Sequence, residues 1–262
     1  MLGHALADVF VEDELVLGDL PDYDLTKYDD LNQKIDQIKP DVIINAAAYT
    51  DVDGCETNQE LCLAVNGLSL KNLSETAKKN NAVLIHYSTD YVFNGTKSTG
   101  YREDEVVDPI NAYGQGKAKG EELIQQSGCN FYLIRTAWLY GPFGKNFVDT
   151  IIDLSTKQQE IKVVNDQLGN PTYAPDLAKA TRQILIDKKP FGVYHQTNAN
   201  SCSWYDFAVK IKEIKGFEAA IVPVSSVEFP RPAKRPNYSI LINTKLPVLR
   251  SWQEALTDYL RK

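Results

Sequence analysis

The sequence lacks several features that mark particular classes of protein. Among its 262 residues no apolar run approaches the roughly 18 that suggest a membrane-spanning helix, and the first residues are not a basic segment followed by an apolar one. The net charge of −7 includes no basic stripe that could neutralise phosphates. We therefore expect a cytoplasmic protein with neither membrane nor nucleic-acid partners.

Patterns typical of metal sites are also missing. The four cysteines show no Cys-x-x-Cys spacing, and only three histidines accompany them. We therefore predict no metal site and interpret the cysteines as reduced, partly buried side chains. His86 and His195 each lie in an apolar strand pattern, which favours core histidines over ligands or bases.

The chain does contain a regular alternation of strand-like and helix-like segments, with 43% hydrophobic residues to fill a core. Expected strands are 15–17, 41–45, 83–87, 131–135, 161–164 and 192–196. Expected helices are 28–38, 59–79, 113–126, 147–156, 174–186, 204–214 and 253–260. This alternation predicts an α/β fold in which crossover helices join the strands of a parallel sheet.

The alternation becomes less regular beyond about Tyr140, and a proline-rich stretch follows at 229–236. We expect a dinucleotide-binding Rossmann domain over residues 1–140. Residues 141–262 would form mainly a substrate-binding lobe, with some segments returning to the Rossmann domain.

Candidate catalytic side chains follow from the strand at 83–87. Ser88 and Thr89 would lie at its carboxyl end, where open α/β sheets bind their ligands. Tyr113 and Lys117 are four apart, so on a helix they share one face. A fixed cation near a phenol lowers its pKa, and this spacing therefore suits acid/base chemistry.

The tyrosine and lysine spacing has a weak point, because such a pair arises by chance about once in a chain with 14 tyrosines. Tyr23 and Lys27 form that chance pair, but they follow Pro21 in a loop and have no strand-end hydroxyl behind them. The combination with Ser88 and Thr89 is what favours the pair at Tyr113.

Several segments together resemble a known family. They are 45–53, 88–95, Tyr113 with Lys117, 135–141, 165–172 and 235–239. In this order, over nearly the whole chain, they resemble the dTDP-4-dehydrorhamnose reductases, which are extended short-chain dehydrogenases/reductases. The resemblance implies a Rossmann-like, doubly wound parallel sheet with a smaller C-terminal substrate lobe. It also implies reduction of the C4 keto group of dTDP-4-dehydro-6-deoxy-L-mannose by NADPH or NADH, giving dTDP-L-rhamnose.

The resemblance assigns roles to three catalytic residues. Thr89 would hydrogen-bond the carbonyl oxygen, Tyr113 would donate a proton to it, and Lys117 would hold the nicotinamide ribose and lower the pKa of the tyrosine. Developing charge on that oxygen explains why donors aimed at it accelerate the reaction.

Three further residues would contact the nucleotide sugar. Asp90 and Trp138 resemble sugar-binding residues, and plain core packing is the alternative for Trp138. Arg235 would pair either with the nucleotide diphosphate or with a surface carboxylate.

Candidate cofactor residues lie mostly at predicted strand ends. The resemblance places Asp24 and Leu25 near the adenine, and a run of small residues along the cofactor: Ala46, Ala47, Ala48 and Tyr49. Asp19 follows the second strand that the fold predicts, where a carboxylate accepts hydrogen bonds from the ribose of NADH and repels the phosphate of NADPH. The alternative for Asp19 is a solvated turn residue.

The beginning of the chain departs most from the family. Gly3 occupies the place of the last glycine of the Gly-rich turn, whereas the first strand and the two earlier glycines are absent. We expect an N-terminally incomplete chain, through a late start or truncation, that binds coenzyme more weakly than an extended one.

Two other functions remain open. One is a nucleotide-sugar epimerase or dehydratase, although resemblance to the dehydratases would require Thr-Asp-Glu or Thr-Glu-Met where this chain has Thr89, Asp90 and Tyr91. The other is a non-catalytic regulatory subunit related to the methionine adenosyltransferase beta subunit. Either a monomer or a homodimer fits the sequence.

Overall fold

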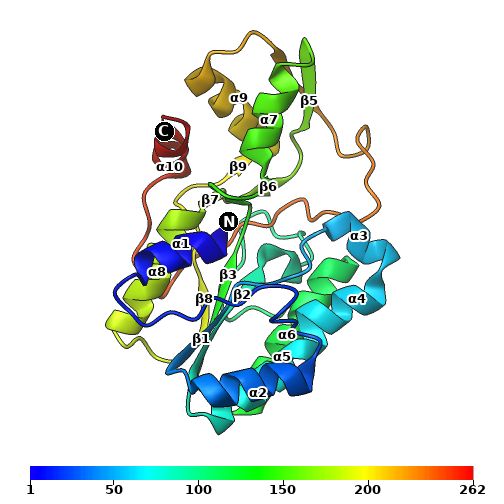
Figure 1. Cartoon of the computed structure of the whole chain (residues 1–262). Coiled ribbons are helices and arrows are strands. Elements are labelled where there is room, and N and C mark those ends of the chain that lie inside the picture. Colours follow the sequence, from blue (N-terminus) through cyan, green and yellow to red (C-terminus); the bar gives the residue numbers. More distant parts are fainter. Residues whose placement is uncertain (262) are drawn as a thin grey trace.

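Four parallel strands form the main sheet of the protein, shown as a computed structural model that describes residues 1–261 (Figure 1). In spatial order they are β1 (Val42–Asn45), β2 (Val83–Thr89), β3 (Phe131–Thr136) and β8 (Gly192–His195). Within the central pair, Thr89 lies opposite Thr136. Because all four strands are parallel, their carboxyl ends share one edge of the sheet.

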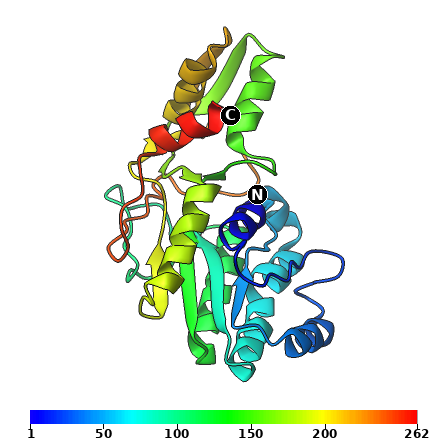
Figure 2. The ribbon, with the colours of Figure 1, turned by 60° about the vertical axis from the view of Figure 1, so that its left-hand side comes forward.

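Helices cover both faces of this sheet (Figures 1 and 2). On one face lie α1 (Leu2–Val9) and α8 (Ala174–Ile186), and on the other α2 (Tyr28–Ile38), α5 (Ser69–Lys79) and α6 (Ala112–Ser127). Successive strand side chains point to opposite faces. Accordingly, Ile85 packs with α1 and α8, whereas Leu84 packs with α2, α5 and α6. The predicted Rossmann-like parallel sheet is confirmed.

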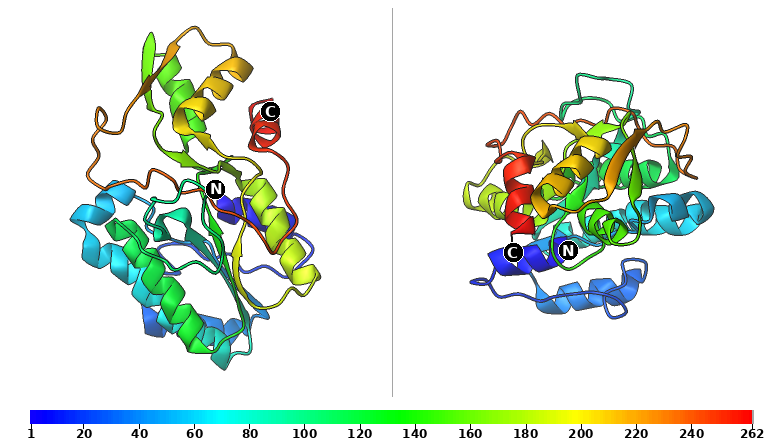
Figure 3. Two further views of the ribbon diagram at one scale, coloured as in Figure 1. Left: turned by 180° about the vertical axis from the view of Figure 1, so that it is seen from behind. Right: turned by 90° about the horizontal axis from the view of Figure 1, so that it is seen from above.

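A smaller group of elements lies beyond the carboxyl edge of the main sheet (Figures 1 and 3). It contains a parallel pair, β5 (Glu160–Val164) with β10 (Ala220–Val224), and three helices: α7 (Phe147–Ser155), α9 (Trp204–Lys215) and α10 (Trp252–Leu260). These elements share their own core around Phe207, which is fully buried.

Two short strand pairs connect this group to the main sheet. They are β4 (Leu139–Tyr140) with β7 (Thr172–Tyr173), parallel, and β6 (Leu168–Gly169) with β9 (Cys202–Ser203), antiparallel. Strands of two residues leave no period in the sequence, and for that reason the pattern did not predict them.

The sequence predicts one continuous helix at 59–79, but the structure divides the segment after β1 into several shorter helices. It consists of α3 (Val52–Thr57), α4 (Gln59–Leu63), a π-helical turn η1 (Ala64–Leu68) and then α5. After β2, a short 3₁₀ turn η2 (Asp90–Val92) carries the chain away from the sheet.

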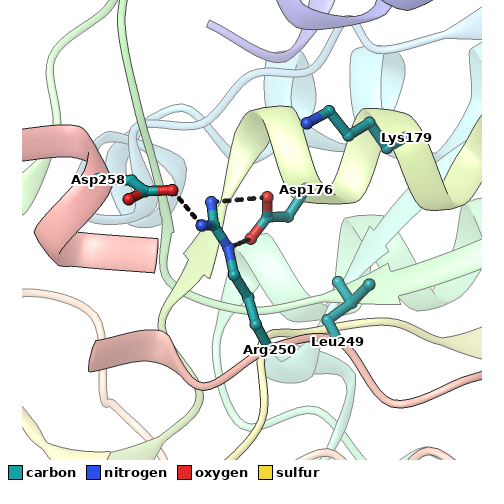
Figure 4. A pocket seen from close by; sticks show the side chains of 5 residues that line it. All are labelled: Asp176, Lys179, Leu249, Arg250 and Asp258. Carbon is teal, nitrogen blue, oxygen red and sulfur yellow. Dashed lines mark hydrogen bonds and ion pairs between the residues drawn. The ribbon is translucent and has the colours of Figure 1, made fainter. Parts of the chain in front are cut away.

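An ion-pair cluster at Arg250 joins α10 to α8 (Figure 4). Its guanidinium makes two bonds to the Asp176 carboxylate, at 2.7 and 3.0 Å, and also binds Asp258. These three residues, with Lys179 and Leu249, line a cavity of about 350 Å³. The cluster therefore fixes α10 to α8, which covers one face of the main sheet. None of the candidate site residues belongs to this cluster.

The prediction of a strand at residues 15–17 is wrong. These residues form no regular structure, and Leu15 and Leu17 are 42% and 73% exposed. Within residues 1–261, β1 pairs only with β2, and residues 15–17 make no backbone pairing with the other edge of β1. An apolar run forms a stable strand only when a neighbour satisfies its backbone groups.

No helix among the described residues combines the length and the apolar character needed to cross a membrane.

Candidate active site

The start of α6 lies directly against the turn that follows β2. A Cβ on Gly114 would come within 2.1 Å of the Tyr91 carbonyl oxygen, so only glycine permits this approach. Asn111 caps the helix by accepting a hydrogen bond from the Gly114 N–H at 2.8 Å. The approach brings Tyr113 next to the end of β2, where its ring meets that of Tyr91 edge-on at 6.0 Å.

Thr89, at the end of β2, is almost buried, and its hydroxyl donates to Asp90 at 2.9 Å. The same oxygen accepts the Tyr91 N–H and so caps the η2 turn. A hydrogen bond with Thr89 also acts on the Tyr113 phenol. The structure therefore places the two predicted donors side by side.

Lys117 lies one turn further along α6 and is almost fully buried. Its ammonium donates to the Tyr87 carbonyl oxygen at 2.9 Å. Burial lowers the pKa of Lys117 to about 8, against an opposing effect of the Glu121 carboxylate. At neutral pH the side chain is therefore still mostly charged.

The pKa of Tyr113 differs from the sequence-based expectation. Burial raises it well above its usual value, with the Asp90 carboxylate acting in the same direction. The expected lowering by Lys117 is not found, and the effect that opposes burial comes from a hydrogen bond with Thr89. A phenol with a raised pKa stays protonated at neutral pH, as a proton donor must.

Asp90 and Trp138 both lie at this edge of the sheet. Asp90 is 2% exposed, and burial raises its pKa to about 6, against the lowering effect of hydrogen bonds from Ser239 and Thr89. Trp138 follows β3 by two residues and is partly exposed.

Arg235 is paired with a carboxylate, Asp53 on α3, which also binds Arg231 at 2.8 Å. Although burial alone would raise the pKa of Asp53, the hydrogen bonds from Arg235 and Ala233 lower it below its usual value. This pairing joins the proline-rich segment at 229–236 to α3. The sequence left two partners open for Arg235, the nucleotide diphosphate and a carboxylate. In this structure Arg235 pairs with a carboxylate, that of Asp53.

The segment after β1 presents small residues to solvent at the same edge. Ala46 and Ala47 are exposed, and Tyr49 is held by Asn66 of the π turn η1 through both its N–H and its C=O, each at 2.9 Å. Asn45 accepts the Ala47 N–H at 3.1 Å. The backbone here is fixed and uncovered, which is what close contact with a nucleotide requires.

Gly3 lies in the first turn of α1, with nothing within 4 Å of where a Cβ would be. No side chain caps this helix start and no acidic residue lies in its first turn. Figure 1 shows the N-terminus beside the carboxyl ends of the central strands. Free N–H groups at a helix start attract phosphate.

The other predicted cofactor residues are further from regular structure. Asp19 is exposed and accepts the Leu20 N–H at 2.8 Å, within a turn and not after a strand. Asp24 accepts from the Thr26 hydroxyl and N–H, which lowers its pKa. Leu25 packs against the core shared by α2 and α5.

Three structurally important residues were absent from the predicted site: Asn66, Gly114 and Asn111. Asn111 has a signal in the sequence, since an asparagine just before a helical pattern is a typical cap. Asn66 and Gly114 act through contacts with distant segments, which a periodicity cannot reveal. Within residues 1–261 no three His, Cys, Asp or Glu side chains are grouped to hold a metal ion.

A strand-end hydroxyl and a Tyr-x-x-x-Lys helix on a parallel sheet together define an oxidoreductase of the short-chain dehydrogenase/reductase class. Over residues 1–262 the chain matches the family described as RmlD substrate binding domain, and it belongs to that family.

Relatives agree with this assignment. A dTDP-4-dehydrorhamnose reductase from Aggregatibacter actinomycetemcomitans is 36% identical, over 98% of this chain and 94% of its own. The crystal structure of one from Clostridium acetobutylicum is 40% identical, with a TM-score of 0.96 over 99% of this chain and 95% of that one. One from Bacillus anthracis, in complex with NADP, is 35% identical, with a TM-score of 0.92 over 98% and 95%. The family resemblance found in the sequence is confirmed.

Proposed function

We propose that the protein reduces the C4 keto group of dTDP-4-dehydro-6-deoxy-L-mannose with NADPH or NADH, giving dTDP-L-rhamnose. The observation that carries this proposal is the convergence of Thr89, Tyr113 and Lys117 at one edge of the sheet, in a chain whose full-length relatives are reductases of this kind.

Binding of the coenzyme would use the strand-end backbone and the start of α1. Ala46 to Tyr49 offer a fixed surface, exposed at Ala46 and Ala47, and the free N–H groups around Gly3 suit the pyrophosphate. Lys117 would hold the nicotinamide ribose. When bound, the coenzyme supplies the hydride that adds to the C4 carbonyl carbon.

Proton transfer would come from Tyr113. As the carbon–oxygen double bond opens, the oxygen gains negative charge, which Thr89 stabilises by a hydrogen bond and Tyr113 neutralises by donating its proton. The raised pKa keeps Tyr113 protonated beforehand. The Lys117 ammonium, one helical turn away, then stabilises the phenolate that remains.

The sugar would lie between Asp90 and Trp138. A buried carboxylate can accept hydrogen bonds from sugar hydroxyls, and the indole offers a flat apolar surface to a deoxysugar. Arg235 would meet the diphosphate, for which it must exchange its bond to Asp53 for one to phosphate.

The remaining parts of the proposal concern setting and assembly. All four cysteines are free thiols, which is usual in a reducing compartment such as the cytoplasm. We place the enzyme there, acting as a monomer or a homodimer. Residues 1–140 would form its coenzyme part and residues 141–262 mainly its substrate part, with segments such as β8 and α8 returning to the coenzyme part.

Oxidation of NADPH and of NADH by the purified protein, with and without dTDP-4-dehydro-6-deoxy-L-mannose, tests this proposal. Coenzyme oxidation that depends on the sugar supports it. Absence of oxidation, together with binding to a methionine adenosyltransferase, would instead support the regulatory-subunit alternative.

A further inference from the structure

The backbone at Trp138 adopts a conformation that bulky residues rarely take. Its φ of +45° lies in the left-handed region, and such strained residues cluster at functional sites. Trp138 lies two residues beyond Thr136, which pairs in register with Thr89. The strained tryptophan is therefore at the same strand-end edge as the candidate catalytic hydroxyl.

One side of the Trp138 indole is covered by a second tryptophan. The ring of Trp204 stacks on it with a centroid distance of 3.6 Å and an interplanar angle of 7°. Trp204 is the first residue of α9, and a capping box between Ser203 and Asp206 fixes that helix start. Phe147 of α7 supports Trp204 in turn, at 4.6 Å between centroids.

Gly169 of β6 restricts the same indole from another direction. A Cβ added there would lie 2.5 to 2.7 Å from the Cε2, Nε1 and Cζ2 atoms of Trp138. Such distances are far below van der Waals contact, so any larger residue must displace the indole. Glycine is often required where φ is positive, but φ at position 169 is not positive. Here glycine is needed because the indole leaves no space for a side chain.

The clamped indole also adjoins the turn that carries Asp90. Trp138 packs against the cluster that contains Val92, the last residue of that turn, and Phe93, the residue after it, and it remains partly exposed. A rigid, partly exposed apolar ring beside buried Asp90 and Thr89 is suited to the apolar face of a 6-deoxyhexose. Rigid positioning favours binding because less side-chain freedom is lost.

We propose that Gly169 and Trp204 are positioning residues that hold the Trp138 indole as the apolar wall of the sugar site, and so determine affinity for the 6-deoxy-4-keto sugar. This inference rests on the proposed function above. It adds two residues, contributed by β6 and α9, to a site whose chemistry comes from β2 and α6.

The test compares Trp204→Leu, Trp204→Phe and Gly169→Ala with the unsubstituted enzyme, measuring KM for the sugar nucleotide and for the coenzyme separately. Loss of the stack in Trp204→Leu should raise the sugar KM about three- to tenfold, and Trp204→Phe should restore most of it. Gly169→Ala should raise it about tenfold or more through the steric clash. The coenzyme KM should change by less than about twofold.

Trp252→Phe is the matched control, because Trp252 lies in the same core and contacts Phe207 edge-on but is not among the rings stacked on Trp138. It should lower thermal stability without changing the sugar KM. Near-ultraviolet circular dichroism reports the stacked indoles independently of activity, and that signal should be lost in Trp204→Leu, altered in Gly169→Ala and kept in Trp252→Phe.

The double variant Trp204→Leu/Gly169→Ala provides a sharper criterion. Removing Trp204 gives the indole room to move, so the alanine should then raise the sugar KM less than it does alone. Inactivity of the unsubstituted enzyme would refute the proposed function and this inference together. An active enzyme in which the sugar KM of Trp204→Leu and Gly169→Ala matches that of Trp252→Phe would refute this inference alone.

Discussion

Replacement of Tyr113 by phenylalanine isolates the proposed proton donor. The substitution removes one hydroxyl and keeps the ring, so the edge-on contact with Tyr91 and the close approach of α6 at Gly114 should persist. The lost hydrogen bond with Thr89 should lower the free energy of unfolding by only about 0.5–1.5 kcal/mol. Folding and coenzyme binding should therefore remain nearly normal.

Turnover should respond far more strongly than stability. A positioned acid or base contributes roughly 10²- to 10⁴-fold to a rate, which corresponds to about 3–5 kcal/mol in the activation free energy. We therefore expect kcat of Tyr113→Phe to fall within that range, measured as sugar-dependent coenzyme oxidation. Thermal denaturation and coenzyme titration on the same sample would confirm that the protein is folded and binds.

Tyr23→Phe is the control for this substitution. Tyr23 has the same spacing to a lysine, Lys27, but lies in the loop before α2, with Lys34 over its ring at 5.1 Å. Its turnover should stay within about twofold of the unsubstituted enzyme. If Tyr113→Phe also stayed within that limit, the proton would come from another group and the assignment would be wrong.

Three further predictions concern single charged groups. Because Lys117 must be positive to hold the coenzyme and stabilise the phenolate, kcat/KM should fall as pH rises through about 8, and Lys117→Arg should move this decline to higher pH because arginine keeps its charge. Asp90 has a folded pKa of about 6, above its unfolded value of about 4, so it costs the protein stability as pH rises from about 4 to about 6, and this cost is constant at higher pH. Asp90→Asn should therefore stabilise the protein by at most about 3 kcal/mol at pH 7 in denaturant titrations, should lose that gain near pH 4, and should weaken sugar binding. Asp19→Ala should raise the KM for NADH more than that for NADPH if the carboxylate meets the ribose, whereas equal effects on both would identify a turn residue.

The sequence predicts the helices and long strands of the main sheet well. Residues 28–38 form α2 within the predicted bounds, and the apolar run at 83–87 is the buried strand β2. In both segments local periodicity and tertiary packing favour the same structure, which is the condition under which a pattern suffices.

Segments that depend on distant partners could not be predicted in this way. Residues 15–17 have strand-like composition but no neighbouring strand, and the π turn in η1 interrupts what the pattern presents as one helix. The placement of Thr89, Tyr113 and Lys117 at one edge of the sheet could be predicted because it depends on residue type and spacing, whereas the raised pKa of Tyr113 depends on burial, which spacing does not reveal. The surroundings of Trp138 could not be predicted, since its indole contacts Trp204 and Gly169, which come from later segments of the chain.

Transfer of a labelled hydride tests the central claim most directly. The purified protein would be incubated with dTDP-4-dehydro-6-deoxy-L-mannose and coenzyme carrying deuterium at both C4 positions of the nicotinamide, and the product examined by NMR and mass spectrometry. We predict dTDP-L-rhamnose with a single deuterium, located at C4 of the sugar. A product without deuterium at that carbon, or recovery of unchanged sugar nucleotide beside intact coenzyme, would contradict the account.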